Sequence, residues 1–514
     1  MLGDILAGFG LVFAWDNLLA ASFGVAFGMI MGAIPGLTSN IAIVLLLPFT
    51  FYLNPIAGIA MLMGLSKGGN FGGSVPAILF NIPGTPQAMV TCLDGYPLAK
   101  QGKIGKALKM ALYASTLGDT QSDLVLFFLA APVAMIALKV GPPEYTMIVL
   151  FSLVVISVAA TEDPFRGGIA TGLGLLFATV GLDPQRGTPR FNFGLLDLSG
   201  GFQILPMVIG LLALSEVFRQ IEIEARQKIE ERQKSAKRAA KGYMNQSEKS
   251  SEADNRVSLS EFKSCLPTIF RSTGIGSAMG IIPGIGTTVA AYLSYIAAKR
   301  ASKHPERFGK GSLEGLAACE SGNNAVVGPN LIPLVTLGIP GNLAAALILG
   351  GFMIKGLIPG PMFMERNAPM LYALFTILFI SNIFTFLIGS FLIRHVRKLT
   401  ELPKPILNTA ILIFCVIGSY VLNSSMFDVI MMFFFGILGY ILTKLKFPLP
   451  PIIVAFFLGS LFERKIRQSL LISGGSFSIF FTRPIALAFF LLTIFGVIFL
   501  ISRRKKDKSR NLTG

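Results

Sequence analysis

Long apolar runs recur along this chain and determine the kind of fold that it can adopt. A helix of about 20 residues crosses a hydrocarbon core of about 30 Å. Runs of that kind occur at about 11–47, 55–93, 107–138, 145–160, 167–181, 202–218, 266–298, 313–358, 370–393, 406–443, 449–462 and 485–502. A mean hydropathy of +0.68 with only 14% charged residues excludes two or three soluble domains. The sequence predicts an all-α polytopic membrane protein with about 12 membrane segments.

Basic residues give the chain a formal net charge of +17, but they gather in the connections between apolar runs. Cytoplasmic retention of basic loops explains this pattern, so nucleic-acid binding is not expected. The four cysteines and two histidines lack the spacing of a disulfide framework or of a metal site. We therefore expect neither a metal nor a cofactor.

A hydrophilic stretch divides the chain into two halves. Residues 219–264 are dominated by Glu, Lys, Arg, Gln and Ser, which predicts a cytoplasmic linker that is helical at its start and disordered after Gly242. A solvated tether is the favoured interpretation, and a regulatory docking site is the alternative. The predicted organisation is a first membrane half, the linker, a second membrane half and a basic cytoplasmic tail, at 1–218, 219–264, 265–502 and 503–514.

The two halves resemble each other. GMIMGAIPGLTSNIA (28–42) aligns without gaps with GSAMGIIPGIGTTVA (276–290), with seven identities in fifteen positions. PAILFNIPGTPQA (76–88) likewise matches PLVTLGIPGNLAA (333–345). Such an internal duplication is typical of secondary transporters.

The charge of the connections predicts that the two repeats are inverted. Residues 1–16 and 51–57 carry no Lys or Arg, so the first hairpin starts and ends outside. The corresponding hairpin of the second half starts at the basic linker and returns to Lys299 and Arg300, which are inside. Arg464, Lys465 and Arg467 fall outside on this assignment, which indicates a re-entrant segment or a different number of spans near 450–483.

Four Ile-Pro-Gly elements interrupt the apolar runs, two in each half. Proline removes a backbone donor and glycine permits unusual backbone angles, so each element should break a helix within the membrane. Irregular backbone is tolerated there only when it is buried in protein or lines a wet cavity. One Pro-Gly is more often a packing kink, but four in duplicated positions favour a binding site between broken, re-entrant hairpins. The predicted helix breaks are Pro35, Pro83, Pro283 and Pro340.

Small polar side chains follow the breaks or lie in two glycine-rich segments, 64–76 and 319–333. A helix that restarts after a break offers free N–H groups and a positive dipole end, which suit a carboxylate. The predicted substrate-binding residues are Thr38, Ser39, Asn40, Lys67, Asn70, Ser74, Asn81, Thr85, Thr287, Thr288, Asn323 and Asn324. Asn342 also follows a break.

Two ionisable residues lie within the apolar segments, where charge is expensive and usually functional. Lys67 is predicted to pair with an anionic substrate and Glu320 to take part in cation coupling. The alternative is that Lys67 and Glu320 reach an interface or neutralise each other. Carbonyls freed at the breaks suit a cation, so the predicted ion-coupling residues are Gly36, Glu320, Gly284 and Gly341.

Glycines at every fourth position, from Gly24 to Gly36 and from Gly276 to Gly284, form the small-xxx-small pattern of close helix packing. We interpret them as a seam against which a mobile hairpin packs. No phosphate loop occurs, since the nearest stretch, 308–312, lacks the leading glycine and the Lys-Ser adjacency. No zinc-protease motif or nucleophile elbow is present, so an enzyme is not expected.

Several long motifs resemble a known family. They are IPGLTSN (34–40), GGNFGGSVPAILFNIPGTP (68–86), LDGYPLAKQGK (93–103), IPGIGTT (282–288), RFGKGSLEGLAACESGNNA (307–325), LIPLVTLGIPG (331–341) and GLIPGPMF (356–363). The pattern resembles the large membrane subunit of the tripartite tricarboxylate transporters, from about residue 10 to residue 500. The glycine-rich signatures of that family correspond to 64–86 and 314–341, while the linker is long for the family.

The resemblance implies a multi-pass permease of the bacterial inner membrane. It implies a small membrane subunit and a periplasmic solute-binding protein as partners, and uptake of citrate or another carboxylate with a sodium or proton gradient. The leading hypothesis is therefore a gradient-driven carboxylate transporter. A passive anion channel is the runner-up, and a membrane scaffold or enzyme, which predicts no flux, is the third hypothesis.

Overall fold

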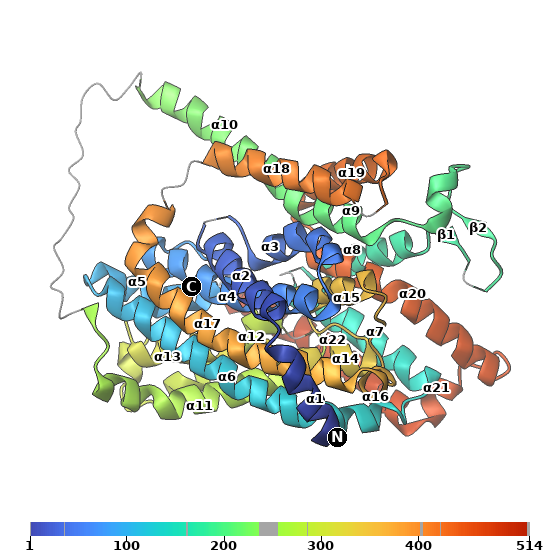
Figure 1. Cartoon of the computed structure of the whole chain (residues 1–514), viewed down its shortest axis with the longest axis horizontal. Coiled ribbons are helices and arrows are strands. Elements are labelled where there is room, and N and C mark those ends of the chain that lie inside the picture. The colour runs from blue at the N-terminus through green and yellow to red at the C-terminus, as the bar shows by residue number, and fades with distance from the viewer. Residues whose placement is uncertain are drawn as a thin grey trace.

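The computed structural model describes residues 2–34, 36–160, 163–183, 185–235, 255–284, 286–400, 404–421 and 423–510. Nearly all of these residues are helical (Figure 1). The one sheet among them is a short antiparallel pair, β1 (Gly181–Leu182) and β2 (Pro189–Arg190), with Gly181 opposite Arg190.

The first half of the chain contains α1 Leu2–Val12, α2 Trp15–Ala33, α3 Ser39–Leu46, η1 Pro48–Tyr52, α4 Pro55–Phe80, α5 Ala88–Lys100, α6 Ile104–Ala137, α7 Pro142–Ala159, α8 Pro164–Ala178, η2 Leu196–Gly200, α9 Ile204–Val208, η3 Ile209–Leu214 and α10 Ser215–Ser235. The second half contains α11 Leu259–Ile281, α12 Gly286–Ala301, η5 Pro305–Arg307, α13 Leu313–Asn324, α14 Leu331–Leu337, α15 Leu343–Ile354, α16 Phe363–Arg366, α17 Ala368–Thr400, α18 Lys404–Val421, α19 Met426–Lys444, α20 Leu449–Ile472, α21 Ile479–Thr482 and α22 Pro484–Arg510.

Long apolar helices confirm the predicted polytopic membrane protein. In the part of the chain that the structure describes, six helices are long and apolar enough to cross a bilayer: Trp15–Ala33, Ile104–Ala137, Pro142–Ala159, Ile204–Arg226, Ala368–His395 and Met426–Lys444. The total of about 12 membrane segments and the inverted orientation of the repeats stay predictions.

Each Ile-Pro-Gly element lies between two helices. The first separates α2 from α3, the second α4 from α5, the third α11 from α12, and the fourth α14 from α15. Gly36 and Gly284, which correspond in the two halves, both have a φ of 94°. Only glycine adopts this backbone conformation without strain, which explains the glycine at the end of the first and third elements. Pro35 lies outside the described residues.

Glycine seams bring helices into close contact in both halves. A Cβ atom on Gly28 of α2 would overlap the carbonyl oxygen of Leu65 in α4. A Cβ atom on Gly276 of α11 would overlap the carbonyl oxygen of Gly322 in α13. Gly28 and Gly276 are aligned by the first repeat match. The offset of the second match, continued toward the amino end from Pro76 and Pro333, places Leu65 opposite Gly322. The two halves therefore share this backbone contact, and the predicted seam packs hairpin against hairpin.

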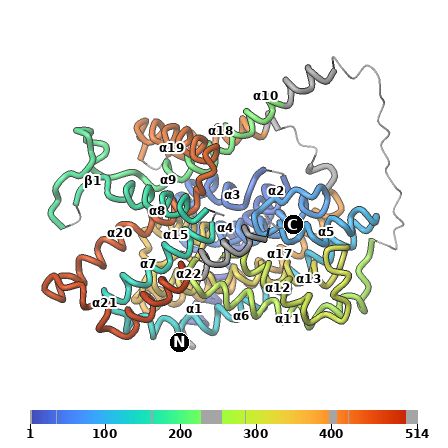
Figure 2. The backbone as a smooth tube through the Cα atoms, turned by 180° about the vertical axis from the view of Figure 1, so that it is seen from behind, coloured from blue at the N-terminus to red at the C-terminus, as the bar shows by residue number. Residues whose placement is uncertain are grey.

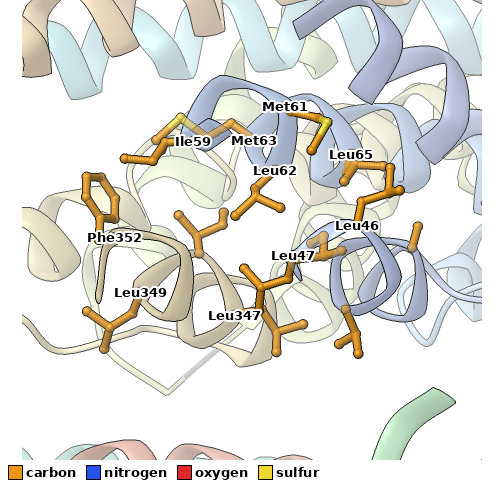
Figure 3. Packing of buried hydrophobic residues seen from close by; sticks show 14 of the residues in the cluster. Leu46, Leu47, Ile59, Met61, Leu62, Met63, Leu65, Leu347, Leu349 and Phe352 are labelled. Atoms are coloured by element: carbon orange, nitrogen blue, oxygen red, sulfur yellow. The ribbon is translucent and has the colours of Figure 1, made fainter. Parts of the chain in front are cut away.

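Apolar side chains bind the broken helices into one core. Figure 3 shows Leu46 and Leu47 at the end of α3 facing Leu62 and Leu65 of α4, with Leu347 of α15 beside them. All five side chains are buried. Within a membrane such packing stabilises through van der Waals contacts rather than through transfer from water, and here it holds the end of α3 against α4 and against α15 of the other half.

The linker begins as a helix, as predicted. Helix α10 continues from η3 and lies with α18 and α19 along one side of the molecule (Figures 1 and 2). The Tyr440 hydroxyl of α19 donates to Glu222 of α10 over 2.6 Å, and Lys444 lies 2.9 Å from the same carboxylate. Residues 236–254 lie outside the described residues, so the predicted disorder after Gly242 stays a prediction. Helix α11 begins at Leu259, ahead of the predicted boundary at 265.

The basic residues near 464–467 are partly balanced by carboxylates. Arg467 of α20 lies 3.0 Å from Asp183, beside β1, and 2.6 Å from Glu463. Arg190 of β2 lies 2.7 Å from Glu463. These ion pairs hold Arg467 beside the loop that contains β1 and β2. The re-entrant segment or different number of spans near 450–483 stays a prediction.

Candidate functional site

A cavity of about 550 Å³ lies where the broken helices meet. Its wall includes residues at the amino ends of four helices. These residues are Thr38, Ser39 and Asn40 at α3, Thr85, Pro86 and Gln87 at α5, Gly284, Gly286, Thr287 and Thr288 at α12, and Asn342, Leu343, Ala344 and Ala345 at α15. Ser66 and Asn70 of α4 and Asn330 before α14 add polar groups, and no described lining residue is charged.

Four helix amino ends at one cavity create a positive potential without a basic side chain. The first N–H groups of a helix have no intrahelical acceptor, and the helix dipole places partial positive charge at the same end. A site of this construction favours carboxylate or phosphate oxygens.

Polar side chains at two of these ends explain why the helices restart there. Thr38 Oγ1 accepts from the N–H of Ile41 over 3.4 Å, and Asn342 Oδ1 accepts from the N–H of Ala345 over 2.9 Å. These are N-cap bonds, which satisfy one orphan donor in each helix. Thr38 therefore has a local structural function as well as a place on the cavity wall.

Two buried donors at the cavity lack a hydrogen-bond partner. They are Nδ2 of Asn70 and Oγ1 of Thr85. Gln87 Nε2 donates to Asn70 Oδ1 over 2.9 Å and so fixes the orientation of the Asn70 amide. Buried polar atoms are nearly always hydrogen-bonded, so these two groups indicate where a ligand with acceptor oxygens would bind.

The structure brings together only part of the predicted set. The predicted residues that line the cavity are Thr38, Ser39, Asn40, Asn70, Thr85, Gly284, Thr287 and Thr288. Those outside its lining are Gly36, Lys67, Ser74, Asn81, Glu320, Asn323, Asn324 and Gly341. The prediction omitted Ser66, Gln87 and Asn330 and did not assign Asn342 to substrate. Asn330 lies in a glycine-rich segment, and Gln87 lies three positions after a break. The search for polar side chains in such positions could therefore have identified both residues.

Lys67 is neutralised by carboxylates of its own chain. Its Nζ atom lies 2.5 Å from Oδ2 of Asp123 and 3.1 Å from Oδ2 of Asp119, both on α6. It also donates to Oδ1 of Asn382 on α17 over 2.8 Å. The geometry therefore does not support pairing of Lys67 with a substrate in this cavity, nor the alternative pairing with Glu320.

Glu320 is held by hydroxyl groups. Ser74 and Thr91 donate to its Oε1 atom over 2.7 and 2.5 Å, and Ser115 donates to Oε2 over 2.9 Å. Asn324 Nδ2 donates to the Glu320 backbone carbonyl over 2.9 Å. The three side-chain bonds join α4, α5, α6 and α13, so Ser74 and Glu320 connect the two halves away from the cavity. The Asn324 bond lies within α13.

The remaining predicted residues have different surroundings. Asn81 is exposed and ends α4 in the left-handed conformation, with a φ of 58°. A Cβ on Gly36 would approach Gln220 of α10, and the carbonyl oxygen of Gly341 accepts from the N–H of Gly284 over 2.8 Å. Asn323 is fully buried and neither amide atom has a partner.

A second cavity of about 1040 Å³ lies on the other side of the break between α14 and α15. Its wall is mainly apolar and includes Tyr145 of α7 together with Leu337 and Gly338 at the end of α14. Arg366, Arg464 and Lys465 are the basic residues of its described lining, which contains no carboxylate. This cavity should therefore attract anions.

A largely helical membrane chain with broken helices around a cavity that has no charged residue in its described lining has the construction of a transport protein. Residues 18–454 match the family described as "Tripartite tricarboxylate transporter TctA family". The chain belongs to this family of transporters, which confirms the resemblance drawn from the motifs.

Two proteins of Agrobacterium vitis are similar to this chain. The "Uncharacterized 52.8 kDa protein in TAR-I ttuC' 3'region" is 34% identical over 516 residues, which cover 99% of this chain and 98% of that protein. The "Uncharacterized protein in TAR-II ttuC' 3'region" is 36% identical over 236 residues, or 45% of this chain and 98% of that protein. No solved structure matches the chain significantly.

Proposed function

We propose that this chain is the large permease subunit of a binding-protein-dependent secondary transporter. It takes up tricarboxylates or related carboxylates across the bacterial inner membrane, with a sodium or proton gradient as the energy source. Its partners are a small membrane subunit and a periplasmic solute-binding protein. Membership of the family supports this assignment.

The observation that carries the proposal is the convergence of four helix amino ends on one cavity. A carboxylate that binds there accepts from N–H groups and from the orphan donors of Asn70 and Thr85. A cavity of about 550 Å³ is large enough for a small di- or tricarboxylate. Because no basic side chain lines the cavity, the bound anion is held by dipoles, from which release is easier than from a buried arginine.

The two cavities support alternating access rather than a continuous pore. The fourth break lies between the lining of the 1040 Å³ cavity, at Gly338, and that of the 550 Å³ cavity, at Asn342. We propose that the basic cavity collects the anion on the outer side and that rearrangement of inverted repeats transfers it. Irregular backbone at the break allows such movement more readily than a continuous helix.

Transport into vesicles tests the proposal. Vesicles carrying the full chain, the small subunit and the binding protein are given labelled citrate and other carboxylates, with sodium and proton gradients imposed separately. Accumulation against the substrate gradient, dependent on the binding protein, is the expected result. Equilibration alone would establish a passive anion channel instead, and absence of flux with every acid tested would overturn the proposal.

A matched pair of variants links the transport to the cavity. Thr287→Val changes a side chain on the cavity wall. Thr376→Val changes a threonine of α17 whose hydroxyl donates to its own helix at Tyr372, away from the cavity. Slower uptake with the first variant and unchanged uptake with the second are expected. Equal uptake by both would remove the 550 Å³ cavity from the transport path.

A further inference from the structure

A second polar cluster lies behind the cavity wall, buried in the helices. It contains Lys67 of α4, Asp119 and Asp123 of α6 and Asn382 of α17. The side chains of Lys67, Asp119 and Asp123 are 0%, 3% and 1% exposed. Asn382 Nδ2 donates to Asp123 Oδ2 over 2.7 Å, and its Oδ1 accepts from Lys67.

The charges of this cluster do not balance. One ammonium group faces two carboxylates, so full ionisation would leave one negative charge buried in the protein. The Oδ2 atoms of both aspartates face Lys67, whereas the Oδ1 atoms of both are buried without a hydrogen-bond partner. An ionised carboxylate in such a place is strongly disfavoured unless something donates to it. Two neighbouring carboxylates that cannot both ionise commonly share one proton.

We propose that Asp119 and Asp123 hold one exchangeable proton, on an Oδ1 atom, and that this is where a proton enters the transport cycle. The inference rests on the proposed function and specifies its coupling ion. Proton binding forms one O–H bond and removes one negative charge, and release to water reverses both. Glu320, which the sequence suggested for cation coupling, is already bonded to three hydroxyls.

Helix α4 links the proton to the substrate cavity. Ser66 and Asn70 line the cavity, while Lys67 between them points to the aspartates. Loss of the proton adds a negative charge beside Lys67 and strengthens its hold on α6. Protonation weakens that hold, so the two charge states favour different positions of α4 relative to α6. A shift of α4 therefore also moves Ser66 and Asn70 in the cavity wall.

The elements around α6 contribute few other titratable groups. On α13, Glu320 accepts from Ser115, one helical turn before Asp119. On α5, Asp94 is bound by the N–H groups of Gly309, Gly311 and Ser312. On α11, Arg271 donates to Thr268, while Glu261 pairs with Lys106 at the end of α6. α14 carries no charged residue, so Lys67 is the charge that directly contacts the proposed proton site.

Infrared spectroscopy of the full chain in lipid nanodiscs tests the proposal without any substrate. A protonated buried carboxyl group absorbs separately from ionised carboxylates. We expect the wild type at neutral pH to show this band and to lose it as pH rises. Asp119→Asn and Asp123→Asn should each remove the band, since one remaining aspartate is balanced by Lys67. Glu320→Gln and Asp428→Asn are matched controls that should leave it unchanged.

The possible outcomes show whether the aspartates bind a proton or a sodium ion. No such band in the wild type, or a band that survives both aspartate variants, would overturn the proposal even if one variant folds poorly. A band that sodium chloride abolishes at constant pH, but potassium chloride does not, would replace the proton by sodium and so also overturn it.

Transport in vesicles separates this inference from the proposed function. In the wild type, a proton gradient should stimulate uptake, and Asp119→Asn should abolish the stimulation while Asp428→Asn keeps it. Full stimulation in Asp119→Asn would overturn the proton site but leave the transporter assignment intact. A wild type that moves no carboxylate would overturn the proposed function, while the infrared band would still report on the proton.

Discussion

The N–H of Gly284 donates to the carbonyl oxygen of Gly341 over 2.8 Å, so the breaks of two hairpins in the second half are joined by a direct backbone bond. Gly284 has a φ of 94° and lines the cavity, and Gly341 precedes Asn342, which also lines it. The position of the α12 amino end therefore depends on that of α15. Any movement that separates the two breaks must first break this bond.

Gly284→Ala should destabilise the protein by about 1–3 kcal/mol because alanine is strained at this φ. Its Cβ would also press against Val155 of α7. Thermal unfolding in detergent should show a lower midpoint. Gly274→Ala is the matched control, because a Cβ at Gly274 in α11 meets nothing within 4 Å. An equal midpoint for Gly284→Ala and the wild type would show that the break adapts freely.

Removal of the orphan donors at the cavity should weaken carboxylate binding. Thr85→Val deletes the unpaired hydroxyl, and Asn70→Ala deletes the unpaired Nδ2 together with the Oδ1 that accepts from Gln87. A hydrogen bond to a charged ligand contributes about 1.5–3 kcal/mol, so each variant should raise the Kd of the transported carboxylate about 10-fold or more. Equilibrium binding of labelled substrate to the purified chain measures this. Thr116→Val, whose hydroxyl donates within α6, should bind as the wild type does, and unchanged Kd values in all three would remove both donors from the site.

Lys67→Met should be among the most destabilising single changes in this chain. It leaves Asp119 and Asp123 buried together, and removal of one partner from a buried ion pair costs about 3–5 kcal/mol. Addition of Asp123→Asn should recover part of the lost stability, because only the Asp119 carboxylate is then buried without Lys67. Thermal unfolding of both variants measures this coupling. Lys139→Met, at an exposed position, should have little effect, and a similar loss at both positions would contradict the ion-pair explanation.

The sequence predicted the cavity better than the charged clusters. Pro-Gly elements and the polar residues after them are local signals, so Thr38, Asn40, Thr85 and Thr287 could be placed at a common site without coordinates. The partners of Lys67 are 52 and 56 positions away in a run that reads only as an apolar helix. Only the packing of α4 against α6 shows that Asp119 and Asp123 face it. A buried lysine in a sequence indicates a partner but does not identify it.

The loop at 308–312 illustrates the same limit. Its glycines resemble a phosphate loop without the full pattern, and its N–H groups do bind an anion. That anion is Asp94 of α5, whose Oδ1 accepts from Gly309, Gly311 and Ser312 over 2.9, 2.9 and 2.7 Å. The loop thus connects the two halves of the chain.

Asp94→Ala should destabilise the protein by about 2–4 kcal/mol, since three N–H donors lose a charged acceptor. Tyr295, whose hydroxyl donates to Asp94 over 2.9 Å, should become more mobile. Thermal unfolding checks the stability, and limited proteolysis at Lys310 checks the loop. Asp197→Ala at an exposed site is the control. Resistance of Lys310 to trypsin in Asp94→Ala, equal to that of the wild type, would show that the loop holds its shape without Asp94.

The ion pair of Asp183 and Arg467 should make the stability of the hairpin that contains β1 and β2 depend on pH. Hydrogen bonds from the Arg467 guanidinium hold the pKa of the Asp183 carboxyl well below its usual range. A lowered folded-state pKa contributes stability above the unfolded pKa of about 4 and loses it as pH falls toward the folded pKa. The thermal midpoint of the wild type should therefore fall in acid below about pH 4. Asp183→Asn should have a lower midpoint at neutral pH and a smaller further loss in acid, whereas Asp197→Asn should follow the wild type. Parallel acid curves for wild type and Asp183→Asn would show that this ion pair does not control acid stability.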